Sequence, residues 1–146
     1  MMFQSDTLAN HPKIRVLIVD DVAETRETLH KTLFLEAGIE VVGTAANGEQ
    51  AVEMAVERQP DIVLMDLILP GIDGFSATEQ ILQQVPSAQI ITMSVNGETD
   101  YLRRSMLVGA REFLIKPFSG YELVSSIRRV FQWGSGGPFT SVSEVG

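Results

Sequence analysis

The residues most able to take part in a reaction are acids, an alcohol and an amine, each at the end of a short apolar run. They are Asp20, Asp21, Asp66, Ser94 and Lys116. Three carboxylates at one place repel one another unless a cation neutralises them, and ligation by oxygen alone favours Mg²⁺ or Mn²⁺ over zinc. An ammonium group and a hydroxyl group suit phosphoryl oxygens, and a carboxylate can accept a phosphoryl group as a nucleophile. This set of residues therefore predicts metal-assisted phosphoryl transfer to an aspartate.

Each of these residues also has an explanation that involves no chemistry. Asp21 could cap the N-terminus of the following helix, and Asp20 and Lys116 could simply end strands. Asp66 precedes a segment rich in Pro and Gly and could be a turn residue, as could Ser94. We predict a site because all five residues occur together at the ends of apolar runs.

Strand-like and helix-like segments alternate along the chain. Apolar, β-branched runs predict strands over 14–19, 39–46, 61–65, 88–93 and 111–115, and helical periodicity predicts helices over 22–37, 48–58, 75–84, 98–108 and 119–131. Asp21 and Glu24 are placed to cap the first helix, and Gly38 is placed to end it in a left-handed conformation. The alternation predicts an α/β fold, with a five-stranded parallel sheet and helices on both faces. Because ligands bind at the carboxyl ends of such strands, the polar strand ends are expected to share one rim.

Composition restricts the class of protein. The 146 residues suit one domain, and the 45% hydrophobic content suits one buried core. The absence of cysteine excludes disulfides and thiolate metal sites, and the net charge of −8 argues against direct binding to nucleic acid. No apolar run approaches the ~20 residues that cross a bilayer, and the first ten residues do not resemble a signal peptide. We therefore expect a cytoplasmic protein without membrane association.

The two ends of the chain differ from its middle. Residues 1–12 are expected to be a flexible lead-in, residues 13–132 the folded domain, and residues 133–146 a flexible tail or linker. The tail contains a Gly-Ser-Gly-Gly stretch of linker composition at residues 134–137. No Gly-rich phosphate-binding loop follows the first strand, which argues against nucleotide binding.

Several short motifs together resemble the two-component response-regulator receiver domain. The resemblance covers residues 13–131. The motifs that carry it are Val19-Asp20-Asp21, Leu64-Met65-Asp66, Leu69-Pro70-Gly71-Ile72-Asp73-Gly74, Ser94 and Lys116-Pro117-Phe118. Each motif is weak alone, and their order and spacing make the set specific. The resemblance implies a (βα)5 flavodoxin-like fold with strand order 2-1-3-4-5.

The resemblance also implies which residues hold the metal ion and which accepts the phosphoryl group. Asp66 is the implied phosphoacceptor. Asp20 and Asp21 hold Mg²⁺, with Mn²⁺ as the other candidate, and Asp66 and the backbone carbonyl of Ile68 are further ligands.

Other positions have implied roles in the response to phosphorylation. Lys116 pairs with the phosphoryl group, and Ser94 turns inward to bond one of its oxygens. Phe113 stands at the switch-aromatic position and rotates inward as Ser94 moves. The peptide bond between Lys116 and Pro117 is expected to be cis.

The family suggests partners of two kinds. A histidine kinase, a phosphotransfer protein or a small donor supplies the phosphoryl group. The predicted helix 98–108, strand 111–115 and helix 119–131 form the surface that controls a partner or output domain and that could form a homodimer. The two helices of this surface carry four arginines that could meet an acidic partner or simply face water: Arg103, Arg104, Arg128 and Arg129. The chain is expected to be a switch rather than an enzyme.

Three further interpretations stand beside this one. Residues 96–118 also resemble receiver domains that precede CpaE-type pilus-assembly ATPase domains, the alternative being a free-standing receiver. A pseudo-receiver that only binds partners would usually lack some of the five polar residues. A phosphatase of the haloacid-dehalogenase kind needs an acid two residues after its nucleophile, but Ile68 follows Asp66 at that distance and Val22 follows Asp20.

Two positions depart from the common receiver pattern. Val95 follows Ser94 where the family often has Ala or Gly, and its branched side chain is expected to crowd the site and slow attack by water. Phe113 replaces the frequent Tyr and has no hydroxyl group for a partner.

Overall fold

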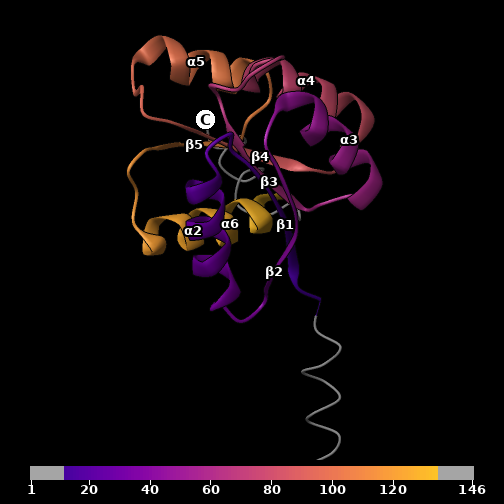
Figure 1. Ribbon diagram of the computed structural model, residues 1–146, viewed down its shortest axis with the longest axis vertical. Helices are drawn as coiled ribbons and strands as arrows, with labels where there is room; N and C mark the ends of the chain where they lie inside the picture. Colours follow the sequence, from indigo (N-terminus) through magenta and orange to yellow (C-terminus); the bar gives the residue numbers. More distant parts are fainter. Residues whose placement is uncertain (1–11, 135–146) are drawn as a thin grey trace, which may run out of the picture.

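The computed structural model describes residues 12–134, in which strands and helices alternate along the chain (Figure 1). The strands are β1 (Ile14–Val19), β2 (Ile39–Ala45), β3 (Ile62–Asp66), β4 (Gln89–Ser94) and β5 (Glu112–Ile115). The helices are α2 (Ala23–Phe34), α3 (Gly48–Arg58), α4 (Gly74–Gln84), α5 (Thr99–Leu107) and α6 (Gly120–Gly134).

The five strands form one parallel sheet in the order β2-β1-β3-β4-β5, which confirms the predicted fold. The central strands are apolar on both faces because each face packs against helices. In β1, Leu17 and Val19 contribute to one core cluster, whereas Val16 and Ile18 contribute to the other. Side chains of α3 and α4 complete the first cluster, and side chains of α2 and α6 complete the second.

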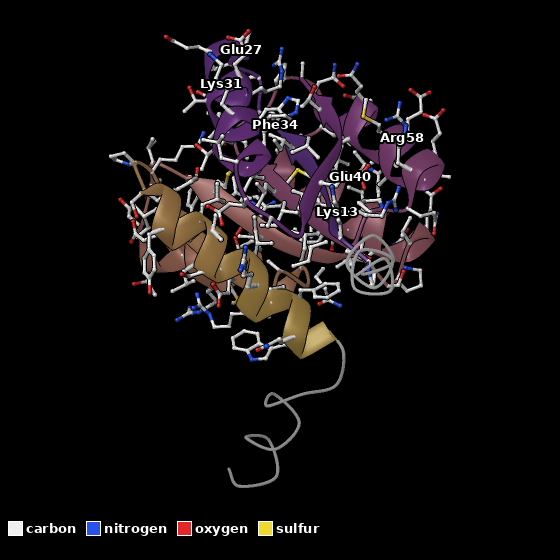
Figure 2. The ribbon with its side chains drawn as sticks, turned by 90° about the horizontal axis from the view of Figure 1, so that it is seen from below. Lys13, Glu27, Lys31, Phe34, Glu40 and Arg58 are labelled. Atoms are coloured by element: carbon white, nitrogen blue, oxygen red, sulfur yellow. The ribbon has the colours of Figure 1, made fainter. Side chains whose placement is uncertain are left out.

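The helices therefore form two layers around the sheet. Figure 1 shows α3, α4 and α5 on one side, and α2 and α6 on the other. Figure 2 shows the second layer, with α2 and α6 in front of the sheet and with Glu27, Lys31 and Phe34 along α2. Within residues 12–134 we find no helix with the length and apolar character needed to cross a membrane.

The predicted ends of the first helix were wrong at both termini. Val22, not Asp21, occupies the N-cap position of α2, and its side chain makes no capping hydrogen bond. The Val22 N–H donates to Oδ1 of Asp20 at 2.9 Å. At the other end α2 stops at Phe34. Gly38 does adopt the left-handed conformation (φ 86°), but it lies in the turn into β2, where its carbonyl accepts the Ile14 N–H at 2.7 Å.

The last helix continues to Gly134, three residues beyond its predicted end at residue 131. The extra turn forms because Trp133, half-buried, packs against the core cluster beneath α6. Apart from Pro12, Trp133 and Gly134, the predicted lead-in and tail lie outside the described residues.

Candidate functional site

The predicted site residues converge at the carboxyl ends of the strands. Asp66 is paired with Met93 in the register of β3 and β4, and Ser94 is paired with Ile115 in the register of β4 and β5. These registers bring the ends of three neighbouring strands level with one another. Lys116, directly after β5, extends across the rim to carboxylates that follow or end two other strands.

Three aspartates form an acidic group at this rim. Asp20, Asp21 and Asp66 each offer one carboxylate oxygen, and these oxygens all lie within 4.8 Å of one another. Asp20 is fully buried, Asp66 is buried and Asp21 is exposed. Three carboxylates beside one lysine leave a formal excess of two negative charges. Oxygen ligands with this charge fit a hard divalent cation such as Mg²⁺.

Lys116 bridges two of these carboxylates. Its Nζ donates to Oδ2 of Asp20 at 2.6 Å and to Oδ2 of Asp66 at 3.4 Å. Burial alone would lower the pKa of Lys116, but the hydrogen bonds and charges of Asp20 and Asp66 outweigh it and raise that pKa. The lysine is therefore a permanent cation at neutral pH, as a partner for phosphoryl oxygens must be.

The pKa of the Asp66 carboxyl group lies a little below neutral pH. Burial raises its pKa from 3.8 to about 6, with a further upward contribution from the charge of Asp20. Lys116 and the backbone N–H of Ile68, which lies 3.4 Å from Oδ1, act in the opposite direction. At pH 7 the carboxylate is thus ionised and able to act as a nucleophile.

The backbone of Asp20 makes two hydrogen bonds that no sequence motif indicates. Its N–H donates to the carbonyl of Ala45 at 3.1 Å, and its own carbonyl accepts from Nη1 of Arg26 at 2.7 Å. Arg26 lies on α2, and its spacing from Asp20 carries no recognisable motif. These bonds fix the backbone of Asp20 in position from strand β2 and from helix α2.

Ser94 is buried at the end of β4 and is engaged in a local turn. Its Oγ accepts the N–H of Asn96 at 3.0 Å, and its carbonyl accepts the N–H of Lys116 at 2.9 Å. Phe113 is half-buried on β5, and the peptide bond between Lys116 and Pro117 is cis, as expected. Val95, beside Ser94, is 73% exposed and lines a groove with Lys116.

Three of the four arginines expected on the predicted output surface have partners within the chain. Arg104 lies over the ring of Phe75 at 4.1 Å. Arg128 pairs with Glu36 at 3.2 Å. Arg129 binds the Glu112 carboxylate through two bonds, of 2.6 and 2.8 Å. These three side chains therefore neither simply face water nor are fully available to an acidic partner.

Comparison with known proteins agrees with this geometry. The response regulator receiver domain family matches residues 16–128. The chemotaxis protein CheY of Thermotoga maritima is 40% identical over 116 residues, which are 80% of this chain and 96% of that protein. The transcriptional regulatory protein DegU of Brevibacillus brevis is 31% identical over 126 residues, 86% of this chain and 53% of DegU. A chain in the crystal structure of the CheX–CheY–BeF3–Mg²⁺ complex from Borrelia burgdorferi has a TM-score of 0.77 and 29% identity, covering 87% of this chain and 93% of that one. The protein therefore belongs to the family of response regulator receiver domains.

Proposed function

We propose that this chain is a phosphoacceptor switch in which Asp66 receives a phosphoryl group. The observation that carries the proposal is that the ionisable carboxylate of Asp66 lies within one acidic group with Asp20 and Asp21 and within 3.4 Å of Lys116. A nucleophile, a cation and a set of oxygen ligands for a metal ion thus share one rim.

The chain's own residues account for most of the transfer. A carboxylate oxygen of Asp66 forms a bond to phosphorus, and the bond from phosphorus to the donor breaks, so that its electron pair leaves with the donor. Lys116 is placed to hold a phosphoryl oxygen. Asp20, Asp21, Asp66 and the backbone carbonyl of Ile68 would hold Mg²⁺, or Mn²⁺ in its place. The bound ion supplies positive charge that offsets the repulsion between the phosphoryl group and the carboxylates.

The switch follows from bonds that exist only in the phosphorylated state. Ser94 Oγ would leave the Asn96 N–H and bond a phosphoryl oxygen, and Phe113 would move inward as Ser94 does. Such differential bonds shift an equilibrium between two existing conformations. The proposed output surface consists of α5, β5 and α6. Large apolar side chains are exposed on each of these elements: Leu102, Leu107, Ile115 and Tyr121.

The switch is proposed to have a phosphodonor, an output partner and a place of action in the cell. A histidine kinase, a phosphotransfer protein or a small phosphodonor supplies the phosphoryl group. The α5-β5-α6 surface, rather than a nucleic-acid-binding element, controls an output partner or domain and offers a contact for a homodimer. Residues 13–132 form the receiver unit, which α6 carries on to Gly134. The chain acts in the cytoplasm as a switch and not as an enzyme.

The test is the intact mass of the protein after incubation with acetyl phosphate. We expect a gain of one phosphoryl group that requires Mg²⁺ and that is absent in Asp66→Asn. Asp73→Asn is the matched control, because Asp73 caps α4 and lies outside the acidic group. Uptake by Asp66→Asn would contradict the proposal. No uptake by the wild type, together with no binding of Mg²⁺ and beryllofluoride, would favour the pseudo-receiver interpretation.

A further inference from the structure

The first turn of α3 interlocks with the loop that joins β3 to α4, residues 67–73. A Cβ atom on Gly71, whose φ is +77°, would lie 2.5 and 2.7 Å from the carboxylate oxygens of Glu49. A Cβ atom on Gly48 would in turn collide with Ile72. Gly71 thus leaves room for the Glu49 carboxylate, and Gly48 leaves room for Ile72. Glu49 Oε2 also accepts the backbone N–H of Ile72 at 3.3 Å.

The start of α3 is itself fixed to the site. Asn47 caps the helix by accepting the N–H of Gln50 at 2.8 Å, and Gln50 Oε1 accepts the N–H of Ala46 at 2.7 Å. Ala45, which precedes Ala46 in the chain, accepts the N–H of Asp20 at its carbonyl oxygen at 3.1 Å. The helix start that carries Glu49 is therefore held in place relative to a buried member of the acidic group.

The loop contacted by Glu49 leads directly from Asp66 and contains Ile68. Its base is closed because Leu67 donates its N–H to Met93 at 3.0 Å and accepts the N–H of Gly74 at 3.0 Å. Within the loop Leu69 is buried in the core, whereas Ile68 is 56% exposed. The bond from Ile72 to Glu49 holds the second half of the loop, after Leu69, against α3.

We propose that Glu49 is a positioning residue that sets the affinity for Mg²⁺ by holding the β3–α4 loop. This inference rests on the proposed function, in which the Ile68 carbonyl is a metal ligand. Glu49 acts through the loop, because it is outside the group formed by Asp20, Asp21 and Asp66. When the bond from Ile72 to Glu49 is lost, this part of the loop must become ordered as the ion binds, and that entropy cost weakens binding.

The test compares variants that separate the hydrogen bond from the charge. Glu49→Gln keeps the length and an acceptor oxygen but loses the charge, whereas Glu49→Asp keeps the charge but is too short to reach Ile72. Glu53→Ala is the matched control, because Glu53 is an exposed acid one turn further along α3. Mg²⁺ affinity is measured by isothermal titration calorimetry on the full chain.

We expect Glu49→Asp and Glu49→Ala to weaken Mg²⁺ binding by roughly three- to tenfold, below the loss typical of groups that directly support a metal ligand. Glu49→Gln and Glu53→Ala should stay close to the wild type. The rate of phosphorylation by acetyl phosphate should be reduced in Glu49→Asp at low Mg²⁺ and restored at saturating Mg²⁺. A merely structural defect would not be restored in this way.

Two results would overturn the inference. Unchanged Mg²⁺ affinity in Glu49→Ala would show that the loop needs no such support. Loss of affinity in Glu49→Gln but not in Glu49→Asp would assign the effect to charge alone. Failure of the proposed function is a separate outcome, because the wild type would then take up no phosphoryl group whatever the order of Mg²⁺ affinities among the variants.

Discussion

Lys116 is closer to Asp20 than to Asp66, with Nζ 2.6 Å from Oδ2 of Asp20 and 3.4 Å from Oδ2 of Asp66. The carboxylate nearest to the lysine is thus a fully buried one that serves as a metal ligand in our proposal. Without a metal ion, Lys116 provides the positive charge that Asp20 needs in a place that water does not reach. When a cation and a phosphoryl group are bound, the lysine can turn toward the phosphoryl oxygens.

Removing the lysine should therefore destabilise the protein most when no metal ion is present. We expect Lys116→Ala to lower the free energy of unfolding by about 2–4 kcal/mol without Mg²⁺, because the buried Asp20 carboxylate keeps the Val22 N–H but loses its opposite charge. Millimolar Mg²⁺ should recover a large part of this loss. Urea unfolding with EDTA or with Mg²⁺ measures both values. Lys31→Ala, on the exposed side of α2, is the control, and a variant as stable as the wild type in EDTA would refute the prediction.

The raised pKa of Asp66 should make stability depend on pH in the absence of Mg²⁺. The folded protein keeps this proton up to about pH 6, whereas the unfolded chain releases it near pH 3.8. Between these values the folded state binds more protons, so the Asp66 contribution to stability falls as pH rises and is constant above about 6.

Asp66→Asn removes this titration and should gain stability relative to the wild type between about pH 4 and 6. The gain is at most about 3 kcal/mol, because the pKa of Asp66 differs by about two between the folded and unfolded states and a difference of one corresponds to about 1.36 kcal/mol. Urea unfolding of both proteins in EDTA from pH 4 to pH 7 measures the difference, in which titrating groups that do not interact with Asp66 cancel. A difference that does not vary with pH would show that the pKa is not raised.

The hydrogen bond from Asn96 to Ser94 should report on switching. When beryllofluoride and Mg²⁺ occupy the site, Ser94 Oγ is expected to turn to the fluoride and to release the Asn96 N–H, whose amide exchange should accelerate. In Ser94→Ala that N–H has no such acceptor, so exchange should be fast both with and without beryllofluoride. Amide exchange followed by NMR measures both proteins. Equal protection of Asn96 in the two states of the wild type would count against movement of Ser94.

Val95 should affect how long the phosphoryl group lasts. The side chain is 73% exposed and lines the groove beside Lys116, so it stands at the approach to the site without being packed into the core. Replacing it by Ala should admit water more easily and speed loss of the phosphoryl group by roughly two- to tenfold. Intact mass against time after donor removal gives the lifetime, with Val56→Ala as a surface control. A lifetime equal to or longer than that of the wild type would contradict the crowding expected of Val95.

Much of the fold and of the site could be predicted from local patterns. An apolar run that ends in an acid, such as Ile14–Val19 before Asp20, indicates both a buried strand and its polar end. The alternation with helices requires a parallel sheet, and a parallel sheet brings all carboxyl ends to one rim. Asp66, Ser94 and Lys116 could thus be placed together with Asp20 without knowing any contact between them.

Helix ends were harder to predict because the first and last residues of a helix depend on contacts with the rest of the fold. Asp21 has the right residue type to cap α2, yet Val22 occupies the N-cap position and no side chain caps the helix there. Likewise, α6 passes its predicted end because Trp133 finds a place on the core. Both outcomes depend on contacts with the rest of the fold and not on the residue types alone.

Periodicity and residue type were enough to predict the order of strands and helices, the buried faces and the kind of chemistry at the rim. Which charges meet could be seen only once the chain was folded. Lys116 binds Asp20 across 96 positions of sequence, Arg26 binds the Asp20 carbonyl, and Glu49 binds a loop 23 positions away. Such pairs depend on the register of strands and on the directions in which side chains leave them, which no short stretch of sequence encodes.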